Sequence, residues 1–448
     1  MKKGIEHVFC RDWRKSYPKI DRGEGVYLFD THGKRYLDGS GGPAVVSIGH
    51  GVFEEIIDAM VGQARKVCFP YVGHFMSEAQ IELAKKIIGF APPGMSQVYF
   101  VSGGSEATEV ALKLIRQYHK EHGNHSRVKV ISRWQSYHGA TIGALSLSGH
   151  TSRRADYLPY LLNFPHILPP YCYRCPFGKE YPSCDIYCAY DLERTIKREG
   201  KESIAAFIAE PIIGNTVGAA VPPPEYFPII REICNRYGIL LVVDEVITGF
   251  GRTGRNFGID HWGVVPDLII TGKGISSGYA PLGAVIMHEG VYEVFTESKR
   301  STFFLGYTYS GNPLSCAVGL AVLRYIEKND LVERSAQMGE YLFKRFSKMK
   351  ELPMVGDIRG KGLLLGVELV IDKGERTPFE RSRKIAETIT SEAFVRGLIL
   401  LSGSGTVDGV SGDHLVIAPP FIIEEEQIEE MAAILEKVIL EVYANTAS

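Results

Sequence analysis

The sequence predicts an α/β protein with two domains. The large domain would hold a mostly parallel sheet covered by helices, and a small α+β domain would be formed by the N- and C-terminal segments. Between about residue 75 and residue 310, short apolar runs alternate with helical segments, as in a parallel sheet buried on both faces. Residues 26–39 instead alternate like a hairpin with its turn at Thr31 to Lys34. Helix and strand patterns return beyond residue 312.

The strands expected in the large sheet are short runs of β-branched and aromatic residues. They lie at 98–101, 128–131, 204–209, 239–243, 268–270 and 284–287. The helix best supported by spacing begins near Ser105, where apolar residues recur at steps of three and four through Tyr118, and ends before His122. We therefore expect a strand, a turn and a helix in succession around residues 98–121.

The C-terminal region predicts the remainder of the small domain. A long helix follows Asn312-Pro313, and later segments read as strand, helix, two short strands and a final helix. Their expected ranges are 362–370, 380–396, 398–401, 414–418 and 424–442. The expected boundaries are 1–74 for the N-terminal part of the small domain, 75–312 for the large domain and 313–448 for the C-terminal part.

Composition excludes several classes of protein. With 50 Lys and Arg against 52 Asp and Glu, the chain has no basic field for nucleic acid. The N-terminus lacks an apolar signal core, and no long uncharged span occurs, so we expect no membrane association and a cytoplasmic location. Eight cysteines in 448 residues do not form the dense framework of a small secreted domain.

A glycine-rich turn lies between the first expected strand and the helix. It reads Val101 to Ala107, with Gly104 and Ser105 at the start of the helix. Glycines let the backbone approach an anion, and a helix N-terminus offers free N–H groups. Gly104 and Ser105 could thus hold a phosphate, although an ordinary turn capped by Ser105 has the same pattern.

Three further residues stand at or near strand ends. Tyr137, followed by His138-Gly139, could stack on a planar cofactor, or be a core tyrosine. Asp244 ends the run 240–243 and could pair with a protonated ring nitrogen, or simply be solvated. Lys273 follows the run 268–270 between two glycines, where a dry pocket would lower its pKa and make it a nucleophile toward an aldehyde.

The ordered combination of these motifs resembles the class III aminotransferases of fold type I, from about residue 20 to residue 440. The matching segments are Ser102 to Ala107, Tyr137-His138-Gly139, Glu210-Pro211, Asp244 to Gly254, Pro266-Asp267, Lys273 and Tyr307 to Pro313. The resemblance implies a sheet of the seven-stranded type and the cofactor pyridoxal 5′-phosphate.

Carried over to this chain, the resemblance implies a role for each matching residue. Lys273 would hold the cofactor as a Schiff base, and Asp244 would pair with the pyridine nitrogen. Tyr137, beside His138, and Val246 would enclose the ring. The remaining implied cofactor-binding residues are Gly104 and Ser105 at the phosphate, Glu210 near the ring edge, and Thr308 at the phosphate of the neighbouring subunit.

The resemblance also implies an activity and an assembly. The enzyme would move an amino group from an amine or ω-amino acid to pyruvate or 2-oxoglutarate by ping-pong kinetics. It would be a homodimer with composite active sites, or a pair of such dimers. A racemase or phospholyase on the same scaffold, and a binding protein that has kept the fold without catalysis, remain alternatives.

Two other motifs match in letters but not in context. Gly249 to Gly254 fits the dinucleotide fingerprint, yet five residues separate it from the strand and no amphipathic helix follows. Residues 274–278 fit the hydrolase elbow around Ser276, but Pro281 and a strand-like run follow where a helix is needed.

Four cysteines lie close together in one segment of the sequence: Cys172, Cys175, Cys184 and Cys188. Pairs of cysteines can bind zinc, but the spacing of these pairs is less typical of a zinc site, and we predict no metal.

The sequence does not identify the residue that binds a substrate carboxylate. The arginines that relatives use for this carboxylate are missing before Ala418 and after Ile399. Arg359, Arg396 or Arg133 could replace them.

Overall fold

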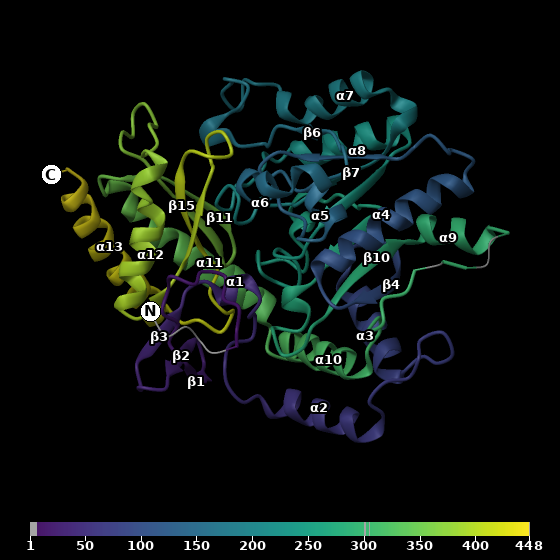
Figure 1. Cartoon of the computed structure of the whole chain (residues 1–448), viewed down its shortest axis with the longest axis horizontal. Coiled ribbons are helices and arrows are strands. Elements are labelled where there is room, and N and C mark those ends of the chain that lie inside the picture. Colours follow the sequence, from purple (N-terminus) through teal and green to yellow (C-terminus); the bar gives the residue numbers. More distant parts are fainter. Residues whose placement is uncertain (1–6, 300–301, 304, 448) are drawn as a thin grey trace.

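The structure is a computed structural model that describes residues 7–299, 302–303 and 305–447. A large central sheet with its helices occupies one side of the molecule, and elements from both ends of the chain gather on the other side (Figure 1). This arrangement confirms the predicted α/β class, with a large sheet-based part and a smaller α+β part.

The large sheet has seven strands in the order β4-β10-β9-β8-β7-β5-β6. They are β4 (Met95–Val101), β5 (Lys129–Arg133), β6 (His166–Ile167), β7 (Ile204–Ala209), β8 (Leu240–Asp244), β9 (Leu268–Thr271) and β10 (Gly283–His288). Strands β5 to β9 pair in parallel, whereas β10 runs antiparallel to β4 and β9. The sheet is therefore mostly parallel, and each of the six predicted runs forms a strand.

Helices cover both faces of this sheet, which explains the continuous apolar runs. Val242 and Ile270 pack with the helix α4 on one face, while Leu241 and Ile269 belong to the core on the other face with α7 and α8. Successive side chains of a strand point to opposite faces, so both sets must be apolar. The helices of this part are α3 (Glu78–Phe90), α4 (Gly104–Glu121), α5 (Ile142–Leu147), α6 (Thr151–Arg154), α7 (Tyr187–Glu199), α8 (Tyr226–Tyr237) and α9 (Glu289–Glu297).

Two four-stranded sheets make up the smaller part. In the first, β13 pairs in parallel with β3, so the two ends of the chain share one sheet. Its strands are β1 (Ile20–Glu24), β2 (Tyr27–Asp30), β3 (Arg35–Asp38) and β13 (Leu398–Ile399). The second contains β11 (Val355–Lys361), β12 (Leu364–Leu369), β15 (Asp413–Ile417) and β14 (Leu401–Ser404). The predicted hairpin is confirmed as β2 and β3.

The remaining helices are α1 (Gly41–Ala44), α2 (Glu54–Lys66), α10 (Pro313–Lys328), α11 (Leu331–Ser347), α12 (Ile385–Val395) and α13 (Glu425–Ala447). The single long helix expected after Pro313 is two helices. Asp330 has the positive φ of 49°, which ends α10 and turns the chain into α11. The predicted domain boundaries at residues 74 and 312 remain a prediction. No helix in the described part of the chain is long and apolar enough to cross a membrane.

Candidate active site

The predicted site residues follow four neighbouring parallel strands. Tyr137 lies beyond β5, Glu210 directly follows β7, Asp244 ends β8 and Lys273 lies two residues after β9. Because these strands are parallel and adjacent in the sheet, their carboxyl ends meet at one edge, where open α/β sheets bind ligands. Residues separated by as many as 136 positions are thereby brought to one edge.

Asp244 is buried and held in a fixed orientation. His138 Nδ1 donates a hydrogen bond to Asp244 Oδ2 over 2.7 Å, and the backbone N–H of Val246 donates to Oδ1 over 3.0 Å. His138 is fixed in turn, since its carbonyl accepts from Thr108 Oγ1 and its N–H donates to Ser148 Oγ, both over 2.8 Å. The sequence placed His138 among the cofactor-binding residues, and its contact in this structure is with the Asp244 carboxylate.

Lys273 is partly buried and has a perturbed amine. Burial is the main reason that the pKa of its ammonium group falls from 10.5 to about 8; the carboxylates of Asp244 and Glu210 oppose this change, and the positive charges of Arg252 and Arg153 add to it. Lys273 also has a φ of 44°, an uncommon conformation for a side chain of this size. A lysine with a pKa near neutrality is a nucleophile toward aldehydes.

Glu210 is an acid with a perturbed pKa at this edge. Burial raises its pKa to about 7, and the negative charge of Asp244 also raises it, while His138 and Arg133 lower it. Its Oε2 lies 3.8 Å from Arg133 NH2 and makes no hydrogen bond among the described residues. A carboxyl group and an amine with perturbed pKa values, Glu210 and Lys273, therefore lie at the same edge as the buried Asp244.

The N-terminus of α4 reaches the same place through glycines. A Cβ added to Gly104 would lie 2.9 Å from Val246 Cγ2, and one added to Gly139 would lie 2.6 Å from Ser105 Oγ. Ser105 Oγ also accepts a hydrogen bond from the N–H of Ala140 over 3.0 Å. The start of α4 at Gly104 and Ser105 thus adjoins Val246 and the loop that contains Tyr137 and Gly139. The free N–H groups of this helix N-terminus are available to an anion.

Tyr137 is stacked by an arginine that the sequence did not single out. The Arg153 guanidinium, on α6, lies 4.5 Å from the centre of the Tyr137 ring. Two adjacent arginines at 153–154 were the signal available in the sequence. Their short helix is not amphipathic enough to indicate which of them faces the site.

Thr308 is not part of this group of residues. It is exposed on the loop between α9 and α10, where the neighbouring Tyr307 ring lies beside Lys113 of α4.

The residues of the two competing motifs make hydrogen bonds within the protein. Arg252, within the segment 249–254, is buried and donates to backbone carbonyls, and no pyrophosphate-binding helix opens there. Ser276 donates to the carbonyl of Ala280 over 2.7 Å.

The four cysteines of the segment 172–188 line one small cavity of about 20 Å³, and none forms a disulfide. Burial raises the pKa of Cys172 to about 11 and that of Cys188 to about 12, and the neighbouring thiols contribute, so both are protonated at neutral pH. Within residues 7–299, 302–303 and 305–447, no three His, Cys, Asp or Glu side chains are grouped so that they could hold a metal ion.

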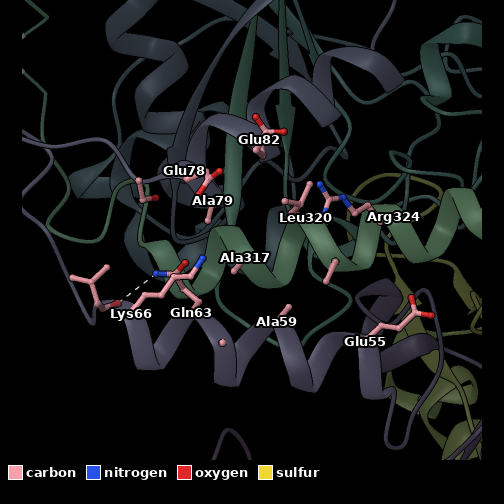
Figure 2. A pocket seen from close by; sticks show the side chains of 14 residues that line it. Glu55, Ala59, Gln63, Lys66, Glu78, Ala79, Glu82, Ala317, Leu320 and Arg324 are labelled. Carbon is pink, nitrogen blue, oxygen red and sulfur yellow. Dashed lines mark hydrogen bonds between the residues drawn. The ribbon is translucent and has the colours of Figure 1, made fainter.

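A larger hollow of about 670 Å³ lies elsewhere, between α2, α3 and α10. Figure 2 shows Gln63 and Lys66 on α2 facing α10 from below, and Glu78 and Glu82 of α3 above α10. None of the strand-end residues lines this groove. The candidate active site is therefore at the edge of the sheet and not in the groove.

Comparison with known proteins points to one family. The family model "Aminotransferase class-III" matches residues 11–439. A Bacillus subtilis protein named uncharacterized aminotransferase YodT is 38% identical over 431 residues, covering 96% of each chain. The putrescine–pyruvate aminotransferase of Pseudomonas aeruginosa is 36% identical over 425 residues, which cover 93% of this chain and 89% of that protein.

Solved structures agree with the sequence relatives. An (S)-enantioselective omega-transaminase from Thermomicrobium roseum superposes with a TM-score of 0.90 at 37% identity, covering 98% of this chain and 96% of the other. A transaminase from the marine bacterium Virgibacillus has a TM-score of 0.91 at 35% identity, covering 98% of each chain.

Proposed function

Because this chain belongs to the class III aminotransferases, which depend on pyridoxal phosphate, we propose that the residues at the sheet edge form its active site. The substrates proposed are an amine or ω-amino acid as donor and an oxo acid, pyruvate or 2-oxoglutarate, as acceptor. The relative from Pseudomonas aeruginosa is named for putrescine and pyruvate, which supports this choice of substrate class.

The residues at the edge fit the cofactor by their chemistry. Lys273 has the lowered pKa that an aldehyde-binding amine needs. Asp244 is a buried carboxylate held by two hydrogen bonds, as a partner for a charged ring nitrogen must be. Glycines at 104 and 139 leave room that a Cβ would fill, and we assign the phosphate to Gly104 and Ser105 at the start of α4.

In this proposal each side chain at the sheet edge has a separate role. When bound, the cofactor supplies an electrophilic aldehyde and a ring that takes up negative charge. Lys273 Nζ would hold the cofactor aldehyde and, once released from it, would accept and return the proton of the substrate carbon. Asp244, oriented by His138, would keep the ring nitrogen protonated. Tyr137 and Val246 would hold the ring between them, and Glu210 would support it at its edge.

The observation that carries the proposal is the position of Lys273 and the buried Asp244 at the ends of the adjacent strands β9 and β8, close enough for the Asp244 charge to act on the Lys273 amine. The test is the absorption spectrum of the cofactor-loaded protein, recorded with a panel of amines before any oxo acid is added. We expect the cofactor band to disappear with a true donor and to return on adding pyruvate or 2-oxoglutarate. A racemase or lyase would form product without an oxo acid, and absence of a cofactor band would refute the site.

We also propose a homodimer in which Thr308 completes the partner's phosphate site, and a cytoplasmic location, which eight unpaired cysteines fit. Thr308 is exposed, and large apolar side chains are exposed on the same loop and on the segment before α3: Tyr309, Tyr71, Phe75 and Met76. Exposed apolar patches mark association surfaces.

Subunit mixing tests this assembly. Lys273→Ala and Thr308→Arg subunits should each be inactive alone. If Thr308 acts across the interface, mixed dimers contain one site with both defects and one intact site, so activity returns. If Thr308 acts within its own subunit, every site keeps one defect and the mixture stays inactive. Sedimentation of each variant serves as the control that Thr308→Arg still forms dimers.

A further inference from the structure

An enzyme that accepts an oxo acid is expected to bind its carboxylate with a cation, and the three arginines suggested by the sequence are either fully buried or held in ion pairs. Arg133 is fully buried and donates to the carbonyl of Glu210 over 2.5 Å. Arg359 pairs with two acidic residues of its own sheet at 3.0 and 2.8 Å. Arg396 pairs with acidic residues of α12 and α13. Arg359 and Arg396 are therefore held in ion pairs, and Arg133 is enclosed by the protein.

Arg153 differs from these three in position and in partners. Its guanidinium lies over the Tyr137 ring at 4.5 Å, and its charge is close enough to Lys273 to lower the pKa of that amine. The side chain is exposed, and within the described part of the chain it forms no ion pair. Its only fixed neighbour at the site is therefore an aromatic face, a contact of modest strength at an exposed position.

The exposure of Arg153 also suits an enzyme that alternates between two kinds of substrate. A buried guanidinium left without a partner while an amine that has no carboxylate occupies the site would carry a large desolvation cost. An exposed guanidinium keeps its water when the amine is bound, and can leave the Tyr137 ring for a carboxylate when an oxo acid arrives. The planar fork of arginine matches a carboxylate in two parallel hydrogen bonds.

We propose that Arg153 binds the carboxylate of the acceptor, so that the acceptors of this enzyme are oxo acids held by α6 beside Tyr137. The inference rests on the proposed function, because it assumes that Lys273 marks the reacting centre. It assigns to Arg153 a specificity role: the residue binds the part of the acceptor that does not react.

The test compares two acceptors in the cofactor-loaded protein: pyruvate, and propanal, which has the reacting carbonyl but no carboxylate. With Arg153→Gln we expect the KM for pyruvate to rise about 10- to 100-fold, the range that loss of a charge-assisted pair produces. Propanal has no carboxylate to lose a partner, so its KM should change far less, and the ratio of kcat/KM for pyruvate to that for propanal should fall about 10- to 100-fold. Arg153→Lys, which keeps the charge without the fork, should recover part of the affinity for pyruvate.

Arg198 is exposed on α7, and Arg198→Gln is the matched control, with no change expected for either acceptor.

The affinity for pyridoxal phosphate and the comparison of the two acceptors separate the competing explanations. Weaker binding of pyridoxal phosphate to Arg153→Gln would mean that Arg153 holds the cofactor phosphate, and equal losses with both acceptors would mean a structural role. Either result, or an unchanged KM for pyruvate, would overturn the proposal. Failure of the proposed function would instead show as a wild-type protein that converts neither acceptor.

Discussion

Replacing Lys273 with methionine should stabilise the cofactor-free protein at neutral pH. The Lys273 pKa falls from 10.5 to about 8 on folding, mainly through burial. At about 1.4 kcal/mol per pKa unit, this difference costs about 3 kcal/mol wherever the amine is charged in both states. Methionine keeps an unbranched side chain of similar length without the charge. A gain of about 3 kcal/mol would raise the Tm of a chain of this size by about 3 °C.

The pH dependence identifies the cause of this gain. Below pH 8 the lysine is charged in both states and the full cost applies. As the pH rises from about 8 to 10.5, the folded protein loses its proton before the unfolded chain does, so wild-type stability rises relative to Lys273→Met and the difference approaches zero. The assay is thermal unfolding of both apoproteins, followed by circular dichroism, between pH 7 and pH 10.5.

A matched substitution separates this effect from a general effect of losing a charge. Lys120 is exposed near the end of α4, so Lys120→Met should leave the Tm unchanged throughout the pH range. If Lys273→Met failed to stabilise the apoprotein at pH 7, or if its advantage persisted at pH 10.5, the buried-amine reasoning would be refuted.

Three further substitutions test the other parts of the site. Asp244→Asn should lower kcat about 100-fold, as expected for loss of a charged partner, while pyridoxal phosphate still binds; an unchanged kcat would remove Asp244 from the site. Gly104→Ala places a Cβ 2.9 Å from Val246 Cγ2 and should weaken cofactor binding about tenfold, measured by equilibrium dialysis. Burial raises the pKa of Glu210 to about 7, so the folded protein should lose stability as the pH rises from 4.5 to 7, because the unfolded chain gives up this proton more readily. Glu210→Gln should therefore flatten the Tm profile across that window, and an identical profile would argue against a buried acid.

The sequence predicted the elements whose pattern is strong. The run that became β8 is entirely apolar up to Asp244 and buried throughout, because helices cover both faces of the sheet. By contrast, β11 ends in Arg359, Gly360 and Lys361 and is only partly buried. As an edge strand of its sheet, it lacks the apolar signal of a central strand, and it was not predicted. The break between α10 and α11 was missed because the αL residue there is Asp330 and not glycine.

In the candidate site, too, the sequence indicates some residues but not the contacts between them. Strand-end residues such as Asp244 and Lys273 could be found because a parallel sheet brings the ends of its strands together. The His138–Asp244 hydrogen bond joins residues 106 positions apart, and the packing of Arg153 on Tyr137 joins a short helix to a loop. Neither contact leaves a periodic signal in the sequence, so both required the three-dimensional arrangement.

The central claim is that Lys273 Nζ is the amine that bonds the cofactor. The most direct measurement is to load the protein with pyridoxal phosphate, reduce it with borohydride, and map the modified peptide by mass spectrometry. We expect one phosphopyridoxyl group per chain, on Lys273, and none in Lys273→Ala treated in the same way. Modification of a different lysine, or equal labelling of the variant, would contradict the assignment.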